Sequence, residues 1–194
     1  MQQGHTDPVA GLVPPLVVGE RVSILLTPTD GQPTEVLGFV TDLTDDLLTV
    51  LDRHGEAHEG RRREVAALRR IPLARGRRPQ ATPRDLLDAL ADRAQAPGAP
   101  WVTRITDLLA GQTPPASVPA WGPTASFGAV TARMEGEWVT VPGGDVTVWR
   151  AAAWWATRMG ARSVQVRVPD DEASHAVAQA LLAAGFTSLD GAAA

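Results

Sequence analysis

The sequence contains no cysteine, no tyrosine and no lysine. Without cysteine the chain has no disulfide framework, iron–sulfur cluster, thiol nucleophile or cysteine-based zinc site. Without lysine it has neither a Schiff-base residue nor a Walker-type phosphate loop. All 18 cationic side chains are therefore arginine. These absences exclude several kinds of catalytic and metal site, but they do not indicate which function the chain has.

Long apolar runs are also missing, and the first residues hold no basic region leading into an apolar core. The sequence therefore predicts neither a membrane span nor a signal peptide. Its 194 residues, 44% of them hydrophobic and 21% charged, suit one large or two small domains with a packed core. We expect a cytoplasmic protein without a membrane partner.

Positive charge is concentrated in residues 61–84, which contain nine arginines and a single acid, Glu64. The segment carries +8, so the remainder carries −12, because the total is −4. Such a contrast predicts one basic segment in an otherwise acidic protein.

Before the basic segment ends, residues 17–73 have the pattern of an all-β module. Runs rich in Val, Leu and Ile alternate with turns that contain Gly, Asp and Pro. The expected strands are 21–27, 35–41, 47–51, 57–59 and 65–71. Five short strands joined by short turns predict a small closed barrel.

Residues 74–120 are predicted to form a basic and helical linker. Thr82 and Pro83 are typical of a helix start, as N-cap and first helical residue. We expect a second, shorter helix over residues 101–110. Residues 112–124 contain four prolines and are expected to be a loop.

Residues 121–194 contain segments with the pattern of strands and segments with the pattern of helices, and they predict a small mixed α/β layer. The expected elements are a hairpin of strands 127–134 and 137–141, a helix from Asp145 to residue 159, a strand at 163–168, a helix from Asp170 to residue 184, and a short strand at 186–189. Taken together, the chain is expected to have an α+β fold.

The last module has a recognisable order of segments. Arg-Ala-Ala-Ala-Trp-Trp-Ala-Thr-Arg-Met-Gly-Ala (150–161) is followed by Val-Gln-Val-Arg-Val (164–168) and by an alanine-rich segment ending in Gly185-Phe186. Over about residues 127–189 this order resembles the GNAT superfamily of N-acetyltransferases. The resemblance implies a loop before the first helix whose backbone N–H groups hold the pyrophosphate of acetyl-CoA.

Counting back from Gly160-Ala161 places that loop at Thr-Val-Pro-Gly-Gly-Asp (140–145). The residues implied for acetyl-CoA are Val141, Gly143, Gly144, Asp145 and Val146.

The basic residue usual in the family is absent, and Asp145 stands where the pyrophosphate would arrive. A carboxylate that caps a helix repels an anion competing for the same N–H groups. The tyrosine that family enzymes often use as general acid is also missing. We predict that Asp145 is a helix cap, that no catalytic residue is present, and that no cofactor is bound.

The order of modules extends the resemblance. An SH3-like barrel ending near Arg-Arg-Ile-Pro (69–72), a helical linker and Trp-Gly-Pro (121–123) before a hairpin resemble a bacterial acetyltransferase family. In that family two GNAT-like halves follow the barrel, and the acetyl-CoA motif lies in the second. Residues 121–189 fit the first half. The resemblance implies a shortened or degenerate relative with an SH3-like β-barrel (17–73), a linker (74–120) and a partial GNAT-like module (121–194).

Two histidines, His54 and His58, stand four residues apart with Glu56 and Glu59 beside them. This spacing is a candidate metal site, but Gly55 and the surrounding strands argue against the helix that would align both imidazoles. We favour solvated loop histidines and predict no metal.

Arginines of the basic segment are candidate partner-binding residues: Arg61, Arg62, Arg63, Arg69 and Arg70. They would hold phosphates of RNA or DNA, or else the first three, Arg61 to Arg63, would pair with acids of the same module, namely Asp42, Asp45, Asp46 and Asp52. Because no aromatic residues are interleaved and the chain is acidic overall, we favour intramolecular pairing.

Trp154 and Trp155 are adjacent on a predicted helix and therefore point about 100° apart. One is expected to pack on the sheet, and the other to lie against a neighbouring element, another subunit or solvent. Both are kept as partner-binding candidates, for a homo-oligomer or another protein.

Three functions follow from these observations. The first is a non-catalytic binding or scaffold protein related to acetyltransferases. The second is an acetyl-CoA-dependent N-acetyltransferase with residues 140–146 as a divergent pyrophosphate loop. The third is an arginine-mediated nucleic-acid binder. Asp145 and the missing tyrosine favour the first.

Overall fold

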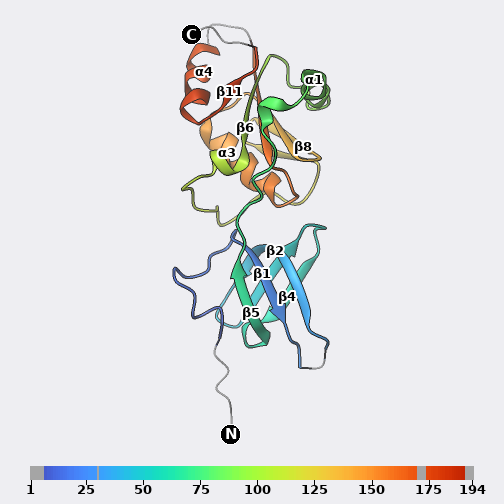
Figure 1. Ribbon diagram of the computed structural model, residues 1–194, viewed down its shortest axis with the longest axis vertical. Helices are drawn as coiled ribbons and strands as arrows, with labels where there is room; N and C mark the ends of the chain where they lie inside the picture. The colour runs from blue at the N-terminus through green and yellow to red at the C-terminus, as the bar shows by residue number, and fades with distance from the viewer. Residues whose placement is uncertain (1–6, 30, 170–173, 191–194) are drawn as a thin grey trace. The chain divides into compact units, whose positions relative to one another are not determined.

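The protein is described by a computed structural model, which covers residues 7–29, 31–169 and 174–190. The chain divides into two compact units (Figure 1). One comprises the chain up to Leu73 together with Thr113–Ser117. The other comprises Ala74–Gln112 and the chain from Val118 onward. Each unit has its own sheet and its own buried core.

The N-terminal unit is built on a five-stranded antiparallel sheet with the order β4-β3-β2-β1-β5. Its strands are β1 (Arg21–Leu26), β2 (Thr34–Leu43), β3 (Leu47–Asp52), β4 (Ala57–Arg61) and β5 (Val65–Arg70). All five predicted strands are thus present. Apolar side chains on the inner face are inaccessible to solvent, including Val22, Ile24, Val40, Leu48 and Val50.

The predicted closed barrel is wrong. A 3-10 turn at Arg62–Glu64 follows β4, and the chain then crosses to pair β5 with β1. Strands β4 and β5 are therefore the two edges of an open sheet. Tight turns and alternating side chains specify which neighbours pair, whereas closure depends on strand tilt and stagger across the whole sheet. The local sequence does not encode that stagger.

The C-terminal unit is built on a six-stranded mixed sheet with the order β11-β6-β10-β9-β8-β7. Its strands are β6 (Ala99–Arg104), β7 (Thr124–Phe127), β8 (Val130–Glu135), β9 (Trp138–Pro142), β10 (Ser163–Val168) and β11 (Thr187–Ser188). Its helices are α1 (Arg84–Arg93), α2 (Ile105–Leu108), α3 (Val146–Thr157) and α4 (Ser174–Ala183), with a 3-10 turn at Pro79–Ala81. Strands β9 and β10 are parallel and are joined through α3, and the other pairs are antiparallel.

Several C-terminal predictions are confirmed. Helix α3 follows an N-cap at Asp145, and β10 has the predicted bounds. The predicted last strand is the short β11. Helix α4 lies within the predicted helix, whereas its predicted cap, Asp170, lies outside the described residues.

The helix predicted over residues 101–110 is wrong. Residues up to Arg104 form β6, and the one-turn helix α2 follows. Strand β6 lies between β10 and β11, so its hydrogen-bonding partners come from segments much later in the chain. The strand predicted at 127–134 corresponds to β8, which forms the predicted hairpin with β9, whereas the preceding strand β7 was not predicted. The non-local pairing of β6 with β10 and β11 overrides the local helical preference of its residues.

The predicted linker is part of the C-terminal fold, because α1, β6 and α2 all belong to that unit. Side chains alternate between sheet faces along β10, so Gln165 and Arg167 share one face. Helix α1 lies on this face, where Gln165 donates a hydrogen bond to the carbonyl of Leu87. Helix α3 lies on the other face, where Trp155 contacts Phe127.

Candidate functional site

The loop predicted to meet acetyl-CoA connects β9 to α3. Gly143 and Gly144 have φ angles of +77° and +87°, values that glycine adopts without strain. Asp145 Oδ1 accepts hydrogen bonds from the backbone N–H groups of Thr147, at 2.8 Å, and Val148, at 3.1 Å. The prediction that Asp145 caps this helix is confirmed.

The same loop is also tied to the helix that follows it. The indole N–H of Trp149 donates a 2.8 Å hydrogen bond to the carbonyl of Gly143, and Trp149 itself is buried. Two N–H groups at the start of α3, those of Thr147 and Val148, already bind the carboxylate of Asp145. A phosphate at this position would compete with Asp145 for those donors and would be repelled by its charge.

The two adjacent tryptophans of α3 differ in their surroundings. Trp155 is 1% exposed, its indole N–H donates to the carbonyl of Ala120 at 3.1 Å, and its ring meets Phe127 edge to face. Burial excludes Trp155 as an exposed partner-binding anchor. Trp154 is half-buried and remains a candidate. Sequence reasoning expected one of the pair in the core without identifying which.

Arginines 61–63, 69 and 70 all lie in the N-terminal unit, and three of them form ion pairs within it. Arg62 pairs with Asp7 at 2.8 Å, Arg69 with Glu35 at 3.9 Å, and Arg70 with Glu20 at 3.0 Å. Intramolecular pairing is therefore found, but the acids differ from the predicted Asp42, Asp45, Asp46 and Asp52. Arg61 and Arg63 are exposed and make no ion pair within the described ranges.

A second group of polar residues lies at the turn between β3 and β4. Ligand atoms of Asp52, Glu56 and His58 lie within 4.8 Å of one another, whereas His54 lies outside this group. The ring Nε2 of His58 is 3.3 Å from Asp52 Oδ2, and Asp52 Oδ1 accepts from the backbone of His54 and Glu56. Burial raises the pKa of Asp52, but these backbone and His58 hydrogen bonds outweigh it and lower the pKa. The contacts describe a hydrogen-bonded hairpin turn, and the absence of a metal remains a prediction.

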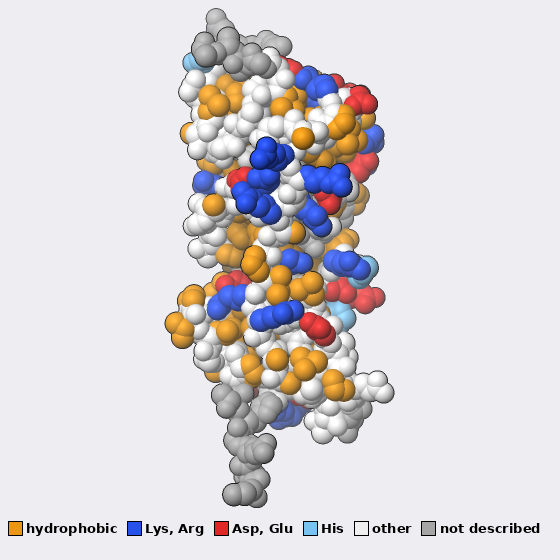
Figure 2. Space-filling model, in the orientation of Figure 1, with side chains coloured by type: hydrophobic (Ala, Val, Ile, Leu, Met, Phe, Trp, Pro, Cys, Tyr) orange, Lys and Arg blue, Asp and Glu red, His pale blue; other side chains and the backbone are white. Residues whose placement is uncertain are grey.

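Sequence reasoning did not single out the arginine cluster of the C-terminal unit, which we define as Arg75, Arg77, Arg78, Arg104 and Arg162. The loop around Gly76 lies against the side chain of Arg162, and Arg104 Nε donates to the carbonyl of Arg77. Figure 2 shows arginine side chains gathered on one face of this unit. The predicted basic segment 61–84 contains three of the five members, whereas Arg104 ends β6 and Arg162 directly precedes β10.

A groove of about 690 Å³ lies beside the arginine cluster. Helix α1 and the segment before it form one wall, and the turn between β8 and β9 forms the other. The residues that line it are Arg77, Arg78, Pro79, Ala81, Thr82, Pro83, Leu86, Leu90, Arg93, Glu135, Gly136, Glu137, Trp138 and Ser163. We call this feature the α1 groove. Its volume is in the range of ligand-binding pockets.

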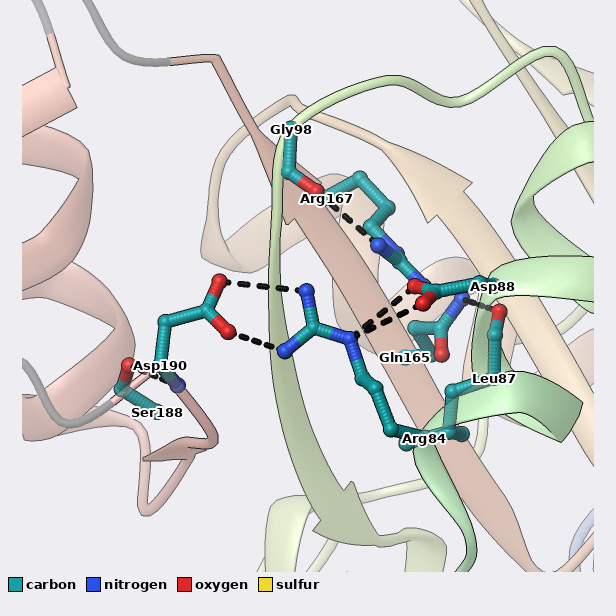
Figure 3. Close-up of polar contacts among 8 residues, drawn as sticks. All are labelled: Arg84, Leu87, Asp88, Gly98, Gln165, Arg167, Ser188 and Asp190. Carbon is teal, nitrogen blue, oxygen red and sulfur yellow. Dashed lines mark hydrogen bonds and ion pairs between the residues drawn. The ribbon is translucent and has the colours of Figure 1, made fainter.

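Polar contacts fix α1, which forms one wall of the α1 groove, to the sheet (Figure 3). Arg167 on β10 donates to Asp88 on α1 at 2.8 Å and to the carbonyl of Gly98 at 2.9 Å. Arg84 on α1 pairs with Asp88 and with Asp190 beyond β11. The hydrogen bond from Arg167, followed by that from Arg84, lowers the pKa of Asp88 despite partial burial.

The described part of the chain contains no helix long and apolar enough to cross a membrane. Comparison of the chain with models of known protein families, with curated proteins and with solved structures finds no match.

Proposed function

We propose that this protein is a non-catalytic binding or scaffold protein related to the GNAT N-acetyltransferases. We infer an SH3-like relationship for the N-terminal sheet and a GNAT-like one for the C-terminal unit. The GNAT-like relationship is supported by the parallel strands β9 and β10, which are joined through α3 and follow the antiparallel strands β7 and β8. This is the order of elements that the sequence resemblance implies.

The observation that carries the proposal is the hydrogen bonding of Asp145. Its carboxylate occupies two of the free N–H groups at the start of α3, which are the donors that a pyrophosphate would need. The loop offers no compensating cation, because residues 138–149 contain no arginine or lysine. An anion binding there would have to displace the cap and accept the negative charge beside it.

The missing tyrosine supports the same conclusion about chemistry. A thiolate leaving group needs a proton donor in reach, and tyrosine and cysteine, two possible donors, are absent from the chain. Residues 140–146 thus lack the basic residue, and the chain lacks the tyrosine, that the resemblance implies for an acetyltransferase. A binding role fits the residues better than acetyl transfer.

Isothermal titration calorimetry with acetyl-CoA tests this proposal. We expect no saturable binding by the wild type at low micromolar concentration. Asp145→Ser keeps a side-chain oxygen for the cap and removes the charge, and Asp145→Gly removes both. Comparing the two variants separates repulsion by the carboxylate from occupation of the N–H groups.

Saturable binding of acetyl-CoA by the wild type, strengthened in Asp145→Gly, would instead identify residues 140–146 as a functional pyrophosphate loop. A thiol reagent then measures turnover with amine acceptors. Since the chain has no cysteine, the signal comes from released CoA alone. Release of CoA that depends on an added amine would replace the binding role by an acetyltransferase.

A further inference from the structure

We propose that the α1 groove binds an acidic peptide segment of a partner protein, with carboxylates on the arginine cluster and an aliphatic side chain against Leu86. This inference deepens the proposed function, on which it rests, by naming the surface and the chemistry of the partner. The groove lies at the start of β9, and the loop at Asp145 follows the end of β9. The two surfaces therefore respond to different substitutions.

Part of the positive charge that lines the groove is uncompensated. Arg77 and Arg78 are exposed, and their side chains form no hydrogen bond or ion pair with any residue the structure describes. Beside them, Arg104 is 3.7 Å from Asp107 and Arg162 is 3.3 Å from Glu137. The five arginines of the cluster thus face two acids. The surplus favours a partner with several negative charges.

Both acids on the opposite wall of the groove already have partners. Glu135 pairs with Arg93 at 2.7 Å, and Glu137 pairs with Arg162. These pairs leave Arg77 and Arg78 as the free cations of the lining within the described ranges. Guanidinium groups bind carboxylates through paired N–H donors, so two neighbouring arginines suit consecutive acidic side chains.

The groove also has exposed apolar surface. Leu86 is 45% exposed on α1, whereas Leu90 and Trp138, which also line the groove, are almost fully buried. Pro79 and Pro83 also line this part of the groove. Covering Leu86 with an aliphatic side chain removes apolar area from water and gives the contact specificity that charge alone lacks.

The lining favours a peptide over a nucleic acid. Base recognition on single strands relies on exposed aromatic rings, whereas Trp138, the aromatic residue of the lining, is 9% exposed. An acidic peptide can place its carboxylates on Arg77 and Arg78 and an apolar side chain on Leu86.

The wall that carries Leu86 is held in place before any partner binds. Arg84 and Asp88, on the same helix, connect α1 to β10 and to Asp190 (Figure 3). A preformed wall lowers the entropy lost on binding, since the helix is not ordered by the partner.

Selection from a phage-displayed library of random dodecapeptides tests the proposal on the full-length chain. We expect enriched peptides to share clustered Asp or Glu residues followed or preceded by one Leu, Ile or Val. The selected consensus, made as a fluorescein-labelled peptide, is then titrated by fluorescence anisotropy. Arg77→Ala/Arg78→Ala should weaken its binding about tenfold or more, and Leu86→Ser should weaken it about threefold to tenfold.

Arg61→Ala/Arg63→Ala is the matched control, because it also removes two exposed arginines but lies in the N-terminal unit. We expect this variant to bind the consensus peptide like the wild type. Far-UV circular dichroism of each variant confirms folding. The affinity should also fall with added salt, as expected for exposed charge pairs.

Three outcomes would overturn the proposal: enrichment of no acidic consensus, equal binding of the consensus by the Arg77/Arg78 double variant, or loss of binding in the Arg61/Arg63 control. Binding of oligouridylate that depends on Arg77 and Arg78, without an acidic peptide consensus, would assign the cluster to nucleic acid instead. A negative result here leaves the acetyl-CoA titration unchanged, so failure of this inference and failure of the proposed function are distinguishable.

Discussion

Arg167 on β10 donates a 2.8 Å hydrogen bond to the carboxylate of Asp88 on α1. The Arg167 side chain is 4% exposed and that of Asp88 is 46% exposed, so a buried cation is joined to an anion at the surface. The pair fixes the helix that forms one wall of the α1 groove. Removing the anion leaves a buried guanidinium with a carbonyl as its remaining partner among the described residues.

Asp88→Ala should therefore reduce the free energy of unfolding by about 1–2 kcal/mol, less than for a fully buried pair because solvent screens Asp88. Arg167→Met should reduce the free energy of unfolding by less, because it removes the buried charge itself. Arg167 Nε also has no partner among the described residues to lose. The double variant should resemble Arg167→Met. Urea unfolding followed by tryptophan fluorescence measures all three.

Asp92→Ala on the same helix is the control for that series, because Asp92 is exposed and forms no ion pair within the described ranges. It should change stability by less than about 0.5 kcal/mol. Additive effects of Asp88→Ala and Arg167→Met would contradict a direct interaction between the two side chains.

The lowered pKa of Asp88 predicts a pH dependence for the same contact. The hydrogen bond from Arg167 stabilises the carboxylate in the folded state, so this pKa lies below its unfolded value of about 3.9. The stabilisation is fully present above that unfolded value and is lost as the pH falls through the folded pKa. Wild type and Asp88→Asn should thus differ most in stability near neutral pH, and the difference should shrink below about pH 4. A difference that grows on acidification would contradict this sign.

The sequence predicts the local parts of this fold well. Tight turns and alternating apolar residues predict β1 to β5, and Asp145 predicts the start of α3, because all of these signals act between near neighbours. Closure of the N-terminal sheet, by contrast, is a property of the whole sheet. Strand β6 was also beyond local reasoning, because its neighbours β10 and β11 follow it far along the chain.

The same distinction applies to the candidate site. The basic segment is visible in the sequence, but Arg104 and Arg162 join Arg77 only through the pairing of β6 with β10. Which tryptophan of α3 is buried depends on the position of Phe127 on β7. These contacts connect distant segments, and periodicity within one helix does not specify them.

The two tryptophans of α3 should respond differently to truncation. Trp155→Ala should destabilise the C-terminal unit by about 3–5 kcal/mol, because it removes a fully buried ring and its hydrogen bond to Ala120. Trp154→Ala should cost less than half as much, since that ring is half-buried. Chemical denaturation measures both values, and acrylamide quenching of Trp154→Phe should show a smaller accessible fraction than wild type. Equal destabilisation by the two alanine variants would contradict the assignment.

Capping by Asp145 predicts a smaller effect. Asp145→Ala should lower stability by about 1 kcal/mol, because two N–H groups at the start of α3 lose their acceptor. Asp145→Ser should retain most of the stability, since serine is also a good N-cap. Thermal unfolding compares the three proteins. A serine variant as unstable as the alanine variant would show that the charge, rather than the hydrogen bonds, provides the stabilisation.

Gly38 in β2 should be the most sensitive glycine of the N-terminal sheet. A Cβ at this position would overlap the backbone carbonyl of Leu51 on β3, and backbone atoms cannot move aside without breaking the strand pairing. Gly38→Ala should therefore destabilise this unit by about 3 kcal/mol.

Gly11→Ala is the control, because its nearest neighbouring atom would be 3.9 Å from the new Cβ. All six tryptophans lie in the C-terminal unit. In Gly38→Ala, the unfolding transition followed by tryptophan fluorescence should therefore be unchanged, whereas the transition followed by far-UV circular dichroism should shift to lower stability. An unshifted transition for Gly38→Ala would contradict the close approach of β2 and β3.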